Sequence, residues 1–449
     1  MRTAFLLLLL LTASLAPAQE QRRHVVMISI DGLMPAHYTR AGELGLRIPN
    51  LRRLMADGVH ATGVIGVLPS VTYPSHTTLV TGVMPRQHGI GSNKIFDPLG
   101  TSGGSWNWYA DAIEVPTLIS AAEARWMTTA SVSWPVSVGL GSDYNVPEFW
   151  RPGSNHEIDR KLLAALSTPG LLRTIETNAG RPLPAPANMT DDDRAGAAAF
   201  IIRTYRPEVM LLHLSDLDGA EHDHGPMTRQ ALEAVEKSDQ MVGNVLDAIR
   251  SAGITDRTLV AIVSDHGFLA IQTTVKPNTL LRAHGFIDVD DKGKVKAWRA
   301  FFHSDGGSSA LHLKDPADLD RVRSLLRRRM GAGHSGLQAI LEADDTRRLG
   351  SRAELVLDAA EGYSFSDSVE GEWFSPATSK GTHGHAPDRP PLHASLILAG
   401  PFSRRGSLGI VPMTSIAPTL AQYLGLTLTS TTSEPISLSL ATREGIAER

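Results

Sequence analysis

Cysteine is absent from the 449-residue chain, which excludes disulfide bonds, thiolate metal ligands and a cysteine nucleophile. An excess of basic charge is also missing, because 43 Lys and Arg residues face 47 Asp and Glu residues, for a formal net charge of −4. A protein that coats nucleic acid needs a basic surface, so we expect no stable nucleic-acid partner. Apolar residues make up 42% of the chain, an ordinary globular proportion that excludes a fibrous or mainly disordered protein.

Long apolar runs are scarce, and the one at the N-terminus has the features of a secretory leader. One arginine precedes an apolar stretch and then Ala16-Pro17-Ala18, the pattern of a signal peptide over residues 1–18. The stretch from Ala4 to Leu11 is too short to cross a bilayer, and no later run is long enough, so we expect no transmembrane segment after leader removal. A secreted chain without cysteine suits a bacterial periplasm or exterior.

Four short apolar runs predict strands that are buried on both faces of a sheet. These runs are rich in β-branched residues and comprise His24–Ile30, Val209–Leu214, Leu259–Val263 and Ala394–Ala399. Amphipathic stretches lie between them, among them Thr228–Ala252 and Met413–Leu424. The alternation of strand and helix predicts an α/β fold with a doubly wound, mostly parallel sheet flanked by helices.

The alternation loosens between Phe268 and Ser379. There, Lys314–Met330 is typical of an exposed basic helix and Asp288–Lys294 of a turn. We therefore expect a smaller inserted α+β subdomain over about residues 270–378. The remainder of residues 23–430 would form the catalytic domain, and residues 431–449 a C-terminal tail.

Aspartates follow three of the four predicted strands, at the edge where a doubly wound sheet binds its ligands. One Asp-Gly pair is usually a turn, but three aspartates, two of them near a histidine, favour a site. Histidine and aspartate without cysteine suit Zn²⁺ or another divalent ion. The candidate ligands are Asp31, Asp218, His222, Asp265, His266 and His383. Six donors are too many for one tetrahedral ion and suit two ions, as in phosphoryl transfer.

A run of hydroxyl residues stands at a predicted helix start within Val67–Asn93. Pro74 and the apolar-periodic residues after it predict a loop that enters a helix near Thr72 or Pro74. A helix N-terminus offers free N–H groups and a positive dipole end to an anion, and a metal-coordinated hydroxyl there is a strong nucleophile. N-capping is the ordinary role of such residues, so residue type alone leaves the choice open among Ser70, Thr72, Ser75, Thr77 and Thr78.

Short motifs extend along the chain from about Val25 to Leu426. In order, they are Ile30-Asp31-Gly32, Thr72-Tyr73-Pro74-Ser75-His76, Thr81-Gly82, His88-Gly89-Ile90, Asn93, Asp218-x3-His222-x2-Gly225-Pro226, Asp265-His266-Gly267 and Gly381-Thr382-His383-Gly384. This set resembles the alkaline phosphatase superfamily, and most closely its nucleotide pyrophosphatase/phosphodiesterase (type I phosphodiesterase) branch. No single motif is specific, but the ordered set is.

The resemblance implies two Zn²⁺ ions per chain, or other divalent metals in their place. Thr72 would bind and be activated by one ion and would form a covalent phospho-threonine intermediate, while the other ion would activate the hydrolytic water. Asn93 would bind a phosphoryl oxygen, with help from the backbone N–H of Thr72. The implied ligands are Asp31, Asp265 and His266 for the first ion, and Asp218, His222 and His383 for the second.

The substrate-binding residues that the resemblance implies are Tyr73, Asn93 and His213. Tyr73 keeps the aromatic residue that the diesterases of the family show just after the threonine. His213 stands where a second aromatic residue usually completes a nucleobase sandwich, so the nucleobase preference stays open. Further aromatic residues either line a substrate pocket or pack in the core, and the sequence does not decide between these roles for Trp106, Trp108 and Tyr109.

The implied activity is hydrolysis of a phosphodiester or pyrophosphate bond in a nucleotide or another small molecule. Threonine-using monoesterases of the superfamily carry a Lys-x-Arg pair in a central segment, whereas Ala130–Ser137 has no basic residue, which favours a singly charged diester. A phosphonoacetate-type hydrolase stays open, and a sulfatase is disfavoured because Thr72-x-Pro74-x-His76 lacks the required motif. A non-catalytic metal-stabilised binding protein would have lost a ligand or the hydroxyl, and all are present. The oligomeric state stays open.

Overall fold

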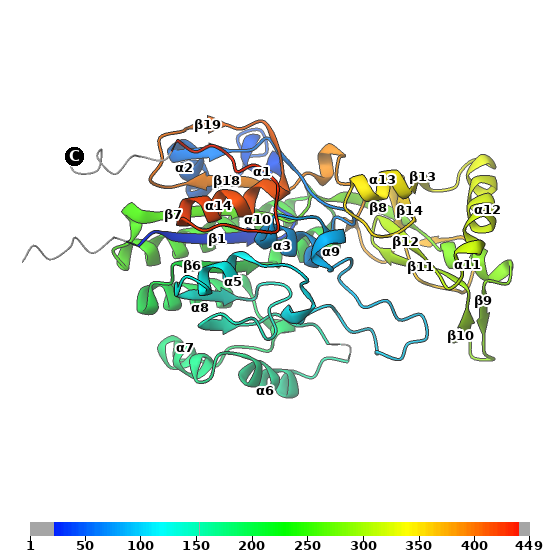
Figure 1. Cartoon of the computed structure of the whole chain (residues 1–449), viewed down its shortest axis with the longest axis horizontal. Helices are drawn as coiled ribbons and strands as arrows, with labels where there is room; N and C mark the ends of the chain where they lie inside the picture. Colours follow the sequence, from blue (N-terminus) through cyan, green and yellow to red (C-terminus); the bar gives the residue numbers. More distant parts are fainter. Residues whose placement is uncertain (1–21, 152, 440–449) are drawn as a thin grey trace, which may run out of the picture.

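The computed structural model describes residues 22–151 and 153–439, so the predicted leader and residues 440–449 of the predicted tail lie outside the described residues. An eight-stranded sheet forms the centre of the larger lobe (Figure 1). Its strand order is β19 (Gly406–Ser407), β2 (Gly58–His60), β18 (Leu396–Ala399), β7 (Thr258–Val263), β1 (His24–Ile30), β6 (Val209–Leu214), β4 (Thr129–Val132) and β5 (Tyr144–Val146).

The five strands from β7 to β5 run parallel. β1 pairs with β6 from Val25↔Val209 to Ile30↔Leu214, and with β7 on its other side. The carboxyl ends of β1, β6 and β7 therefore meet at one edge. β18 pairs antiparallel with β7, so its amino end, and not its carboxyl end, lies at that edge. The predicted α/β fold with a mostly parallel, doubly wound sheet is confirmed.

Helices cover both faces of the sheet, because alternate residues of each central strand point to opposite sides. Val26 and Ile28 of β1 join one apolar core, and Val25 and Met27 join the other. The helices on the first face are α2 (Pro49–Asp57), α6 (His156–Leu166), α7 (Leu171–Ala179), α8 (Asp191–Tyr205) and α10 (Arg229–Ser251). Those on the second face are α3 (Thr72–Thr81), α5 (Leu118–Glu123) and α14 (Ile416–Leu424).

Short elements connect these layers. The short helices are α1 (Pro35–Thr39), α4 (Pro85–His88), α9 (Asp216–His224), η1 (Ala110–Ala112), η2 (Pro186–Asn188), η3 (Thr255–Arg257), η5 (Pro390–Leu392) and η6 (Met413–Ser415). β3 (Gly63–Ile65) pairs with β20 (Ile410–Pro412). Within the described part of the chain, no helix combines the length and the apolar character needed to span a membrane.

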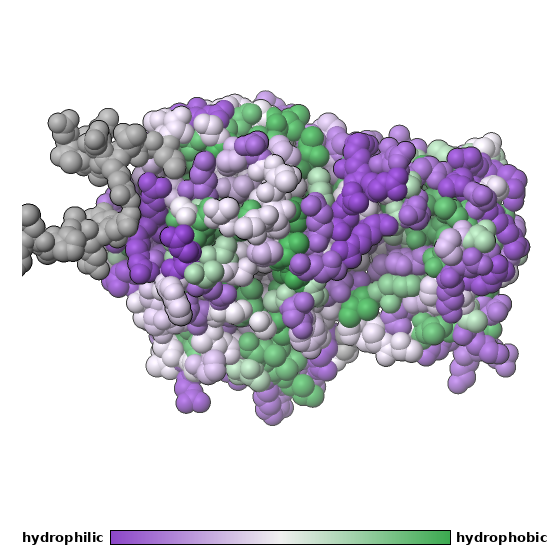
Figure 2. Space-filling model, viewed as in Figure 1, coloured by the Kyte–Doolittle hydropathy of each residue, from purple (hydrophilic) through white to green (hydrophobic). Residues whose placement is uncertain are grey.

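A second lobe extends from one end of the large sheet, and its visible face is mostly hydrophilic (Figures 1 and 2). One of its sheets has the order β11 (Ala300–Asp305), β12 (Ser308–Leu313), β14 (Leu355–Ala359) and β13 (Leu337–Glu342). The other contains β15 (Gly362–Phe365), β8 (Leu269–Val275), β16 (Phe374–Pro376) and β17 (Gly381–Thr382). The remaining elements are β9 (Ile287–Val289), β10 (Val295–Trp298), α11 (Pro277–Ala283), η4 (Pro316–Asp318), α12 (Leu319–Gly331) and α13 (Ala343–Arg348).

This second lobe has its own apolar core, to which Phe286, Phe302 and Leu326 contribute. The turn that joins β11 to β12 nevertheless reaches the predicted metal site. There the N–H of Gly307 donates a hydrogen bond of 2.7 Å to the carbonyl of His383, the residue after β17. Asp305 beside this turn accepts a hydrogen bond from Ser92, so the two lobes are in direct contact.

The buried centre of the sheet predicts a large difference between two isoleucine truncations. Ile28 in β1 is fully buried, whereas Ile410 in β20 is 58% exposed. Ile28→Ala should lower the free energy of unfolding by about 2–5 kcal/mol, because it leaves a cavity between the sheet and the helices on its first face. Ile410→Ala should change it by no more than about 0.5 kcal/mol. Equal losses in urea denaturation would contradict this description of the core.

Candidate active site

Three aspartates meet at the carboxyl edge of the sheet because their strands are neighbours there. Asp31 follows β1 directly, and its N–H donates a hydrogen bond of 2.9 Å to Leu214 at the end of β6. Asp265 follows β7, and one of its oxygens accepts a bond of 3.3 Å from the N–H of Gly32. Asp218 lies in the first turn of α9, which follows β6. Asp31 and Asp265 are buried, and Asp218 is half-buried.

Three histidines complete the cluster, so the structure brings together all six predicted metal ligands. His266 Nε2 lies 3.3 Å from Asp31 Oδ1 and 3.0 Å from Asp265 Oδ2. Asp218 Oδ1 lies 3.4 Å from His222 Nε2 and 3.6 Å from His383 Nε2. Two donor groups result, each with its ligand atoms within 4.8 Å of one another, and Asp218 belongs to both: Asp31, Asp218 and His266 in one, and Asp218, His222 and His383 in the other.

These donors fit divalent cations because no Lys or Arg in the described part of the chain balances their negative charge. Among the described residues, the ion pairs of Asp31, Asp218 and Asp265 involve histidines, and none involves Lys or Arg. One oxygen of each carboxylate is buried without a hydrogen-bond partner. An unpaired buried charge is costly, and binding a metal ion removes that cost. The donor set of carboxylate and imidazole is the one that Zn²⁺ accepts.

The pKa values of Asp31 and His383 reflect burial and the crowding of like charges at this site. Burial raises the pKa of Asp31 well above its usual range, and the nearby charges of Asp265 and Asp218 add to the rise. Burial lowers the pKa of His383 well below its usual range, and the nearby His266 and His222 act in the same direction. A neutral imidazole is the form that ligates a metal, so the environment of His383 favours a ligand.

Backbone carbonyls orient two of the imidazoles. His222 Nδ1 lies 2.9 Å from the carbonyl oxygen of Gly381, and His383 Nδ1 lies 3.1 Å from that of Ser70. Such acceptors hold the proton on Nδ1 and leave the Nε2 lone pair for a metal. The ring of His266 stacks on that of His383 with 3.6 Å between centroids. The donor atoms are therefore held in place by the fold.

Thr72 is the first residue of α3, and the structure decides which hydroxyl of this segment is free. The N-cap is Val71, which offers no side-chain oxygen. Thr72 is 8% exposed, and within the described residues its hydroxyl makes no hydrogen bond to another group. The other candidates are occupied or fully buried: Ser70 Oγ donates to His385, Thr77 Oγ1 donates to Tyr73, Thr78 Oγ1 pairs with His88, and Ser75 is fully buried.

His76 ties the first turn of α3 to the carboxylate cluster. Its Nδ1 lies 2.8 Å from the carbonyl oxygen of Thr72 and 3.7 Å from Asp265 Oδ2, and its Nε2 lies 2.8 Å from the hydroxyl of Ser29 in β1. Asn93 stands at the same helix end, where its Oδ1 accepts a bond of 2.7 Å from the N–H of Tyr73. The side-chain NH₂ of Asn93 is left to donate to an anion at the helix N-terminus.

Tyr73 and His213 are both buried, whereas the expected role in substrate binding requires an exposed ring. Tyr73 is fully buried against Ile90, Val136 and Trp106. His213 is 1% exposed and bridges two carboxylates, with Nδ1 2.9 Å from Glu148 Oε2 and Nε2 3.0 Å from Asp31 Oδ2. Both rings are packed inside the protein. His213 contacts Asp31 Oδ2, the oxygen that does not face His266, and so orients this carboxylate.

The three further aromatic residues divide between packing and exposure. Trp106 and Trp108 are partly buried against the apolar cluster around Tyr73. The ring of Trp106 lies 5.3 Å from that of Tyr73 in an edge-on arrangement. Tyr109 is 52% exposed. Packing in the core therefore accounts for both tryptophans.

Sequence reasoning missed two buried acidic residues. Glu148 comes two residues after β5 ends, at the same sheet edge as the predicted aspartates, and that position was an available signal. Glu221 lies one position before His222, with its carboxylate against Gly32 and its Oε1 3.9 Å from His37 Nε2. Burial raises the pKa of Glu221 well above its usual range, and the charge of Asp218 adds to the rise.

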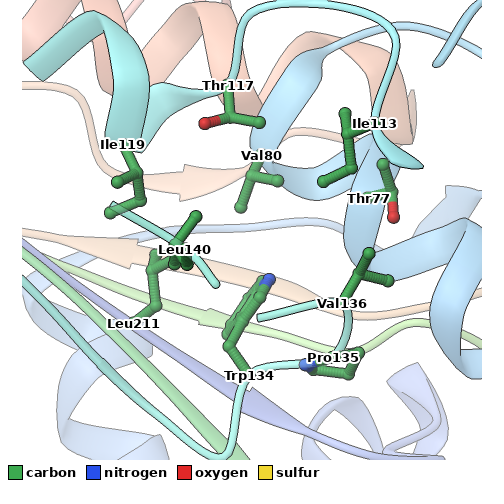
Figure 3. Close-up of a pocket in the computed structure, with 10 residues that line it drawn as sticks. All are labelled: Thr77, Val80, Ile113, Thr117, Ile119, Trp134, Pro135, Val136, Leu140 and Leu211. Atoms are coloured by element: carbon green, nitrogen blue, oxygen red, sulfur yellow. The ribbon is translucent and has the colours of Figure 1, made fainter. Parts of the chain in front are cut away.

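Two further cavities lie in the part of the chain that the structure describes, and none of the six predicted metal ligands lines either of them. One, of about 10 Å³, is lined by Thr77, Trp134 and Val136 among others, and it has room for one water molecule at most (Figure 3). The other is an apolar groove of about 420 Å³, lined in part by Met34 and Phe268. The ring of Phe268 packs against His222, His266 and His383, so it forms a wall between the groove and the histidines.

Comparison with solved structures defines the class of fold. The chain superimposes on murine ectonucleotide pyrophosphatase/phosphodiesterase 5, solved as an inactive variant in complex with AMP, with a TM-score of 0.65 and 18% identity, covering 93% of this chain and 98% of the other. Human ectonucleotide pyrophosphatase/phosphodiesterase 5 matches with the same TM-score and identity, covering 93% and 97%. The fold is thus of the alkaline-phosphatase-like α/β class.

Sequence comparison then gives the family. The family described as type I phosphodiesterase/nucleotide pyrophosphatase matches residues 25–386, and the chain belongs to this family. Ectonucleotide pyrophosphatase/phosphodiesterase family member 1 of Rattus norvegicus is 26% identical over 252 residues, which cover 56% of this chain and 24% of the relative. Venom phosphodiesterase 2 of Crotalus adamanteus is 23% identical over 258 residues, covering 57% and 28%. The chain thus spans about a quarter of the length of these curated relatives.

The unbalanced carboxylates predict stabilisation by divalent cations. Zn²⁺ at roughly 100 times its Kd should stabilise the wild type by about 2.7 kcal/mol, and a chelator should reverse this. Asp218→Asn should lose most of the stabilisation, because Asp218 belongs to both donor groups. Asp223→Asn, on the exposed side of the same helix, is the matched control and should keep it. Equal shifts of the thermal midpoint in both variants would contradict the site.

Proposed function

We propose that the protein hydrolyses phosphodiester or pyrophosphate bonds of nucleotides or similar small molecules, with Thr72 as the nucleophile. The observation that carries this proposal is the free hydroxyl of Thr72 at the N-terminus of α3, which is tied through His76 to the six-ligand cluster. Membership of the family supports it, as do the names of the relatives, which are nucleotide pyrophosphatases and phosphodiesterases. The AMP bound to the murine protein supports a nucleotide substrate.

We further propose that two divalent cations, with Zn²⁺ as the best fit, are the cofactors. Asp31, Asp265 and His266 would hold one, and Asp218, His222 and His383 the other. When bound, such cations lower the pKa of coordinated oxygens and neutralise charge on a phosphoryl group. The Glu148–His213 pair orients Asp31, since outer hydrogen bonds of this kind fix the direction of a ligand.

The proposed reaction has two steps, formation of a phospho-threonine and its hydrolysis. Thr72 Oγ1 gives its proton to solvent water and attacks phosphorus, while the bond from phosphorus to the leaving oxygen breaks and that oxygen keeps the electron pair. A water molecule next attacks the phospho-threonine, which returns the hydroxyl to Thr72 and releases the second product. In both steps the Asn93 NH₂ group and the backbone N–H of Thr72 donate hydrogen bonds to the non-bridging oxygens, since the N–H of Tyr73 already bonds Asn93 Oδ1.

The electrostatics of the site favour a singly charged phosphodiester. Among the described residues, the ion pairs at the site involve no Lys or Arg, and Ala130–Ser137 has no basic residue, which supports a substrate with a single negative charge. We also propose that the protein acts outside the cytoplasm, because its sequence begins with a predicted leader.

Replacement of the nucleophile tests the proposal directly. Thr72→Ala should lower kcat by at least about 10³-fold, because no other hydroxyl of the segment is free to attack. Elemental analysis should still find two metal ions per chain in this variant. Thr81→Ala, at the other end of α3, is the matched control and should keep near wild-type turnover. Retained turnover in Thr72→Ala would remove Thr72 from the mechanism.

The diester preference can be measured with two chromogenic substrates. The kcat/KM for bis-p-nitrophenyl phosphate should exceed that for p-nitrophenyl phosphate by about tenfold or more, which corresponds to about 1.4 kcal/mol of transition-state stabilisation. The reason is the lack of a basic side chain for the extra charge of the monoester. Faster cleavage of the monoester would reverse the assignment and favour a phosphomonoesterase.

A further inference from the structure

A polar cluster stands beside Asn93, with buried Ser92 and His303 at its centre and exposed Asp367 at its edge, and the proposed chemistry does not use it. It consists of four residues, which we call the Ser92 cluster: Ser92, His303, Asp305 and Asp367. Ser92 Oγ donates a hydrogen bond of 2.7 Å to Asp305 Oδ1 and lies 3.2 Å from His303 Nε2. His303 Nδ1 lies 3.1 Å from Asp367 Oδ2. Ser92 belongs to the larger lobe, and the other three residues belong to the second lobe.

The order Ser92–His303–Asp367 resembles a hydrolytic serine triad, but the positions of the protons exclude that role. A triad serine donates its proton to a neutral histidine. Here the Ser92 hydroxyl donates to Asp305, and its oxygen also accepts from the N–H of Lys94 at 3.2 Å. Burial acts to lower the pKa of His303, but the hydrogen bond to Asp367 and the charge of Asp305 raise it to about 9. His303 is therefore a donor at neutral pH, and Ser92 is held in place.

The geometry around this cluster links it to both parts of the active site. Asn93 follows Ser92 directly in the chain, so fixing the Ser92 side chain fixes the start of the Asn93 backbone. Asp305 begins the turn between β11 and β12, whose Gly307 N–H bonds the His383 carbonyl at 2.7 Å. The turn is tightly packed there, since a Cβ added at Gly384 would lie 1.8 Å from the Asp305 carbonyl oxygen. One turn of the second lobe thus touches the Asn93 loop and a predicted metal ligand.

An aromatic contact also joins the loop that contains Asn93 to the second lobe. Phe96 stacks on His312 of β12 with 3.7 Å between ring centroids, and its ring lies 5.7 Å from that of His303. Asn107 adds hydrogen bonds to the backbone, with its Nδ2 2.8 Å from the Ser92 carbonyl and its N–H 2.9 Å from the Asn93 carbonyl. The loop is therefore held on both sides of Asn93, by Ser92 before it and by Phe96 after it. The contact of Ser92 with the second lobe is to the carboxylate of Asp305.

We propose that the Ser92 cluster is a positioning device, through which the second lobe sets the place of Asn93 in phosphoryl-oxygen binding. This inference rests on the proposed function, because it assigns Ser92, His303 and Asp305 an effect on catalysis through Asn93. A charge-assisted contact suits this role, since such hydrogen bonds are shorter and stronger than neutral ones. Displacement of an oxyanion donor by a fraction of an ångström weakens its contribution in the transition state.

A double-mutant cycle on Ser92 and Asn93 tests the proposal, with bis-p-nitrophenyl phosphate as substrate. Asn93→Ala should lower kcat by about 10²–10³-fold, the usual loss for one oxyanion donor. Ser92→Ala should lower kcat by about tenfold with little change in KM, and Asp305→Asn should behave alike. The double variant should match Asn93→Ala alone, because Ser92 acts only through Asn93.

Controls separate this role from a general loss of structure. Ser105→Ala, in the same loop, removes a hydroxyl that donates to the Ser102 carbonyl, and its kcat should stay near wild type. Metal content and the thermal midpoint of Ser92→Ala should also stay near wild type. Additive losses in the double variant, or wild-type kcat in both Ser92→Ala and Asp305→Asn, would overturn the positioning role while leaving the proposed function intact. A wild type without turnover would overturn the proposed function, and this inference with it.

Discussion

Negative charge without basic side chains to balance it is the constraint on which the rest of this structure depends. Asp31, Asp218 and Asp265 converge at the ends of three neighbouring strands, and Glu221 lies buried beside them. Their ion pairs reach only histidines within the described residues. Burying such charge is costly, and a cation at this place would reduce the cost, so the sheet edge is a candidate metal site. The same cations are what a phosphoryl group in transfer requires.

Both lobes contribute to the surroundings of this charge. The larger lobe supplies the strands that hold the carboxylates and the helix that begins at Thr72. The second lobe reaches the site through the turn after β11, which bonds the backbone at His383 and holds the loop of Asn93 through Ser92. The second lobe thereby touches both a predicted metal ligand and the predicted phosphoryl-oxygen donor. Its contribution lies in geometry, since none of the six predicted metal ligands comes from its two main sheets.

Much of the fold was predictable because its central strands are apolar on both faces. The runs at 24–30, 209–214, 259–263 and 394–399 all lie in the large sheet, with ends shifted by two residues or fewer. The antiparallel direction of β18 was not predictable, because a buried strand has the same composition in either direction. The burial of Tyr73 and His213 was not predictable for a related reason. Residue type shows that a ring is present, but the neighbours Trp106, Glu148 and Asp31 decide whether it is buried.

Sequence alone was enough to predict the sheet, the helix that begins at Thr72 and the chemical types of the six predicted metal ligands, because these predictions follow from local periodicity and from motifs in a fixed order. The tertiary structure was needed to show which hydroxyl is free. Ser70 bonds His385, 315 positions away, and Thr78 pairs with His88 across the turn after α3. Thr77 bonds Tyr73 within its own helix, whereas the Thr72 hydroxyl has no such partner among the described residues. The tertiary structure also decided the contacts of Ser92 with His303 and Asp305, more than 200 positions away. Distances of that kind are set by packing between lobes, and no local pattern encodes them.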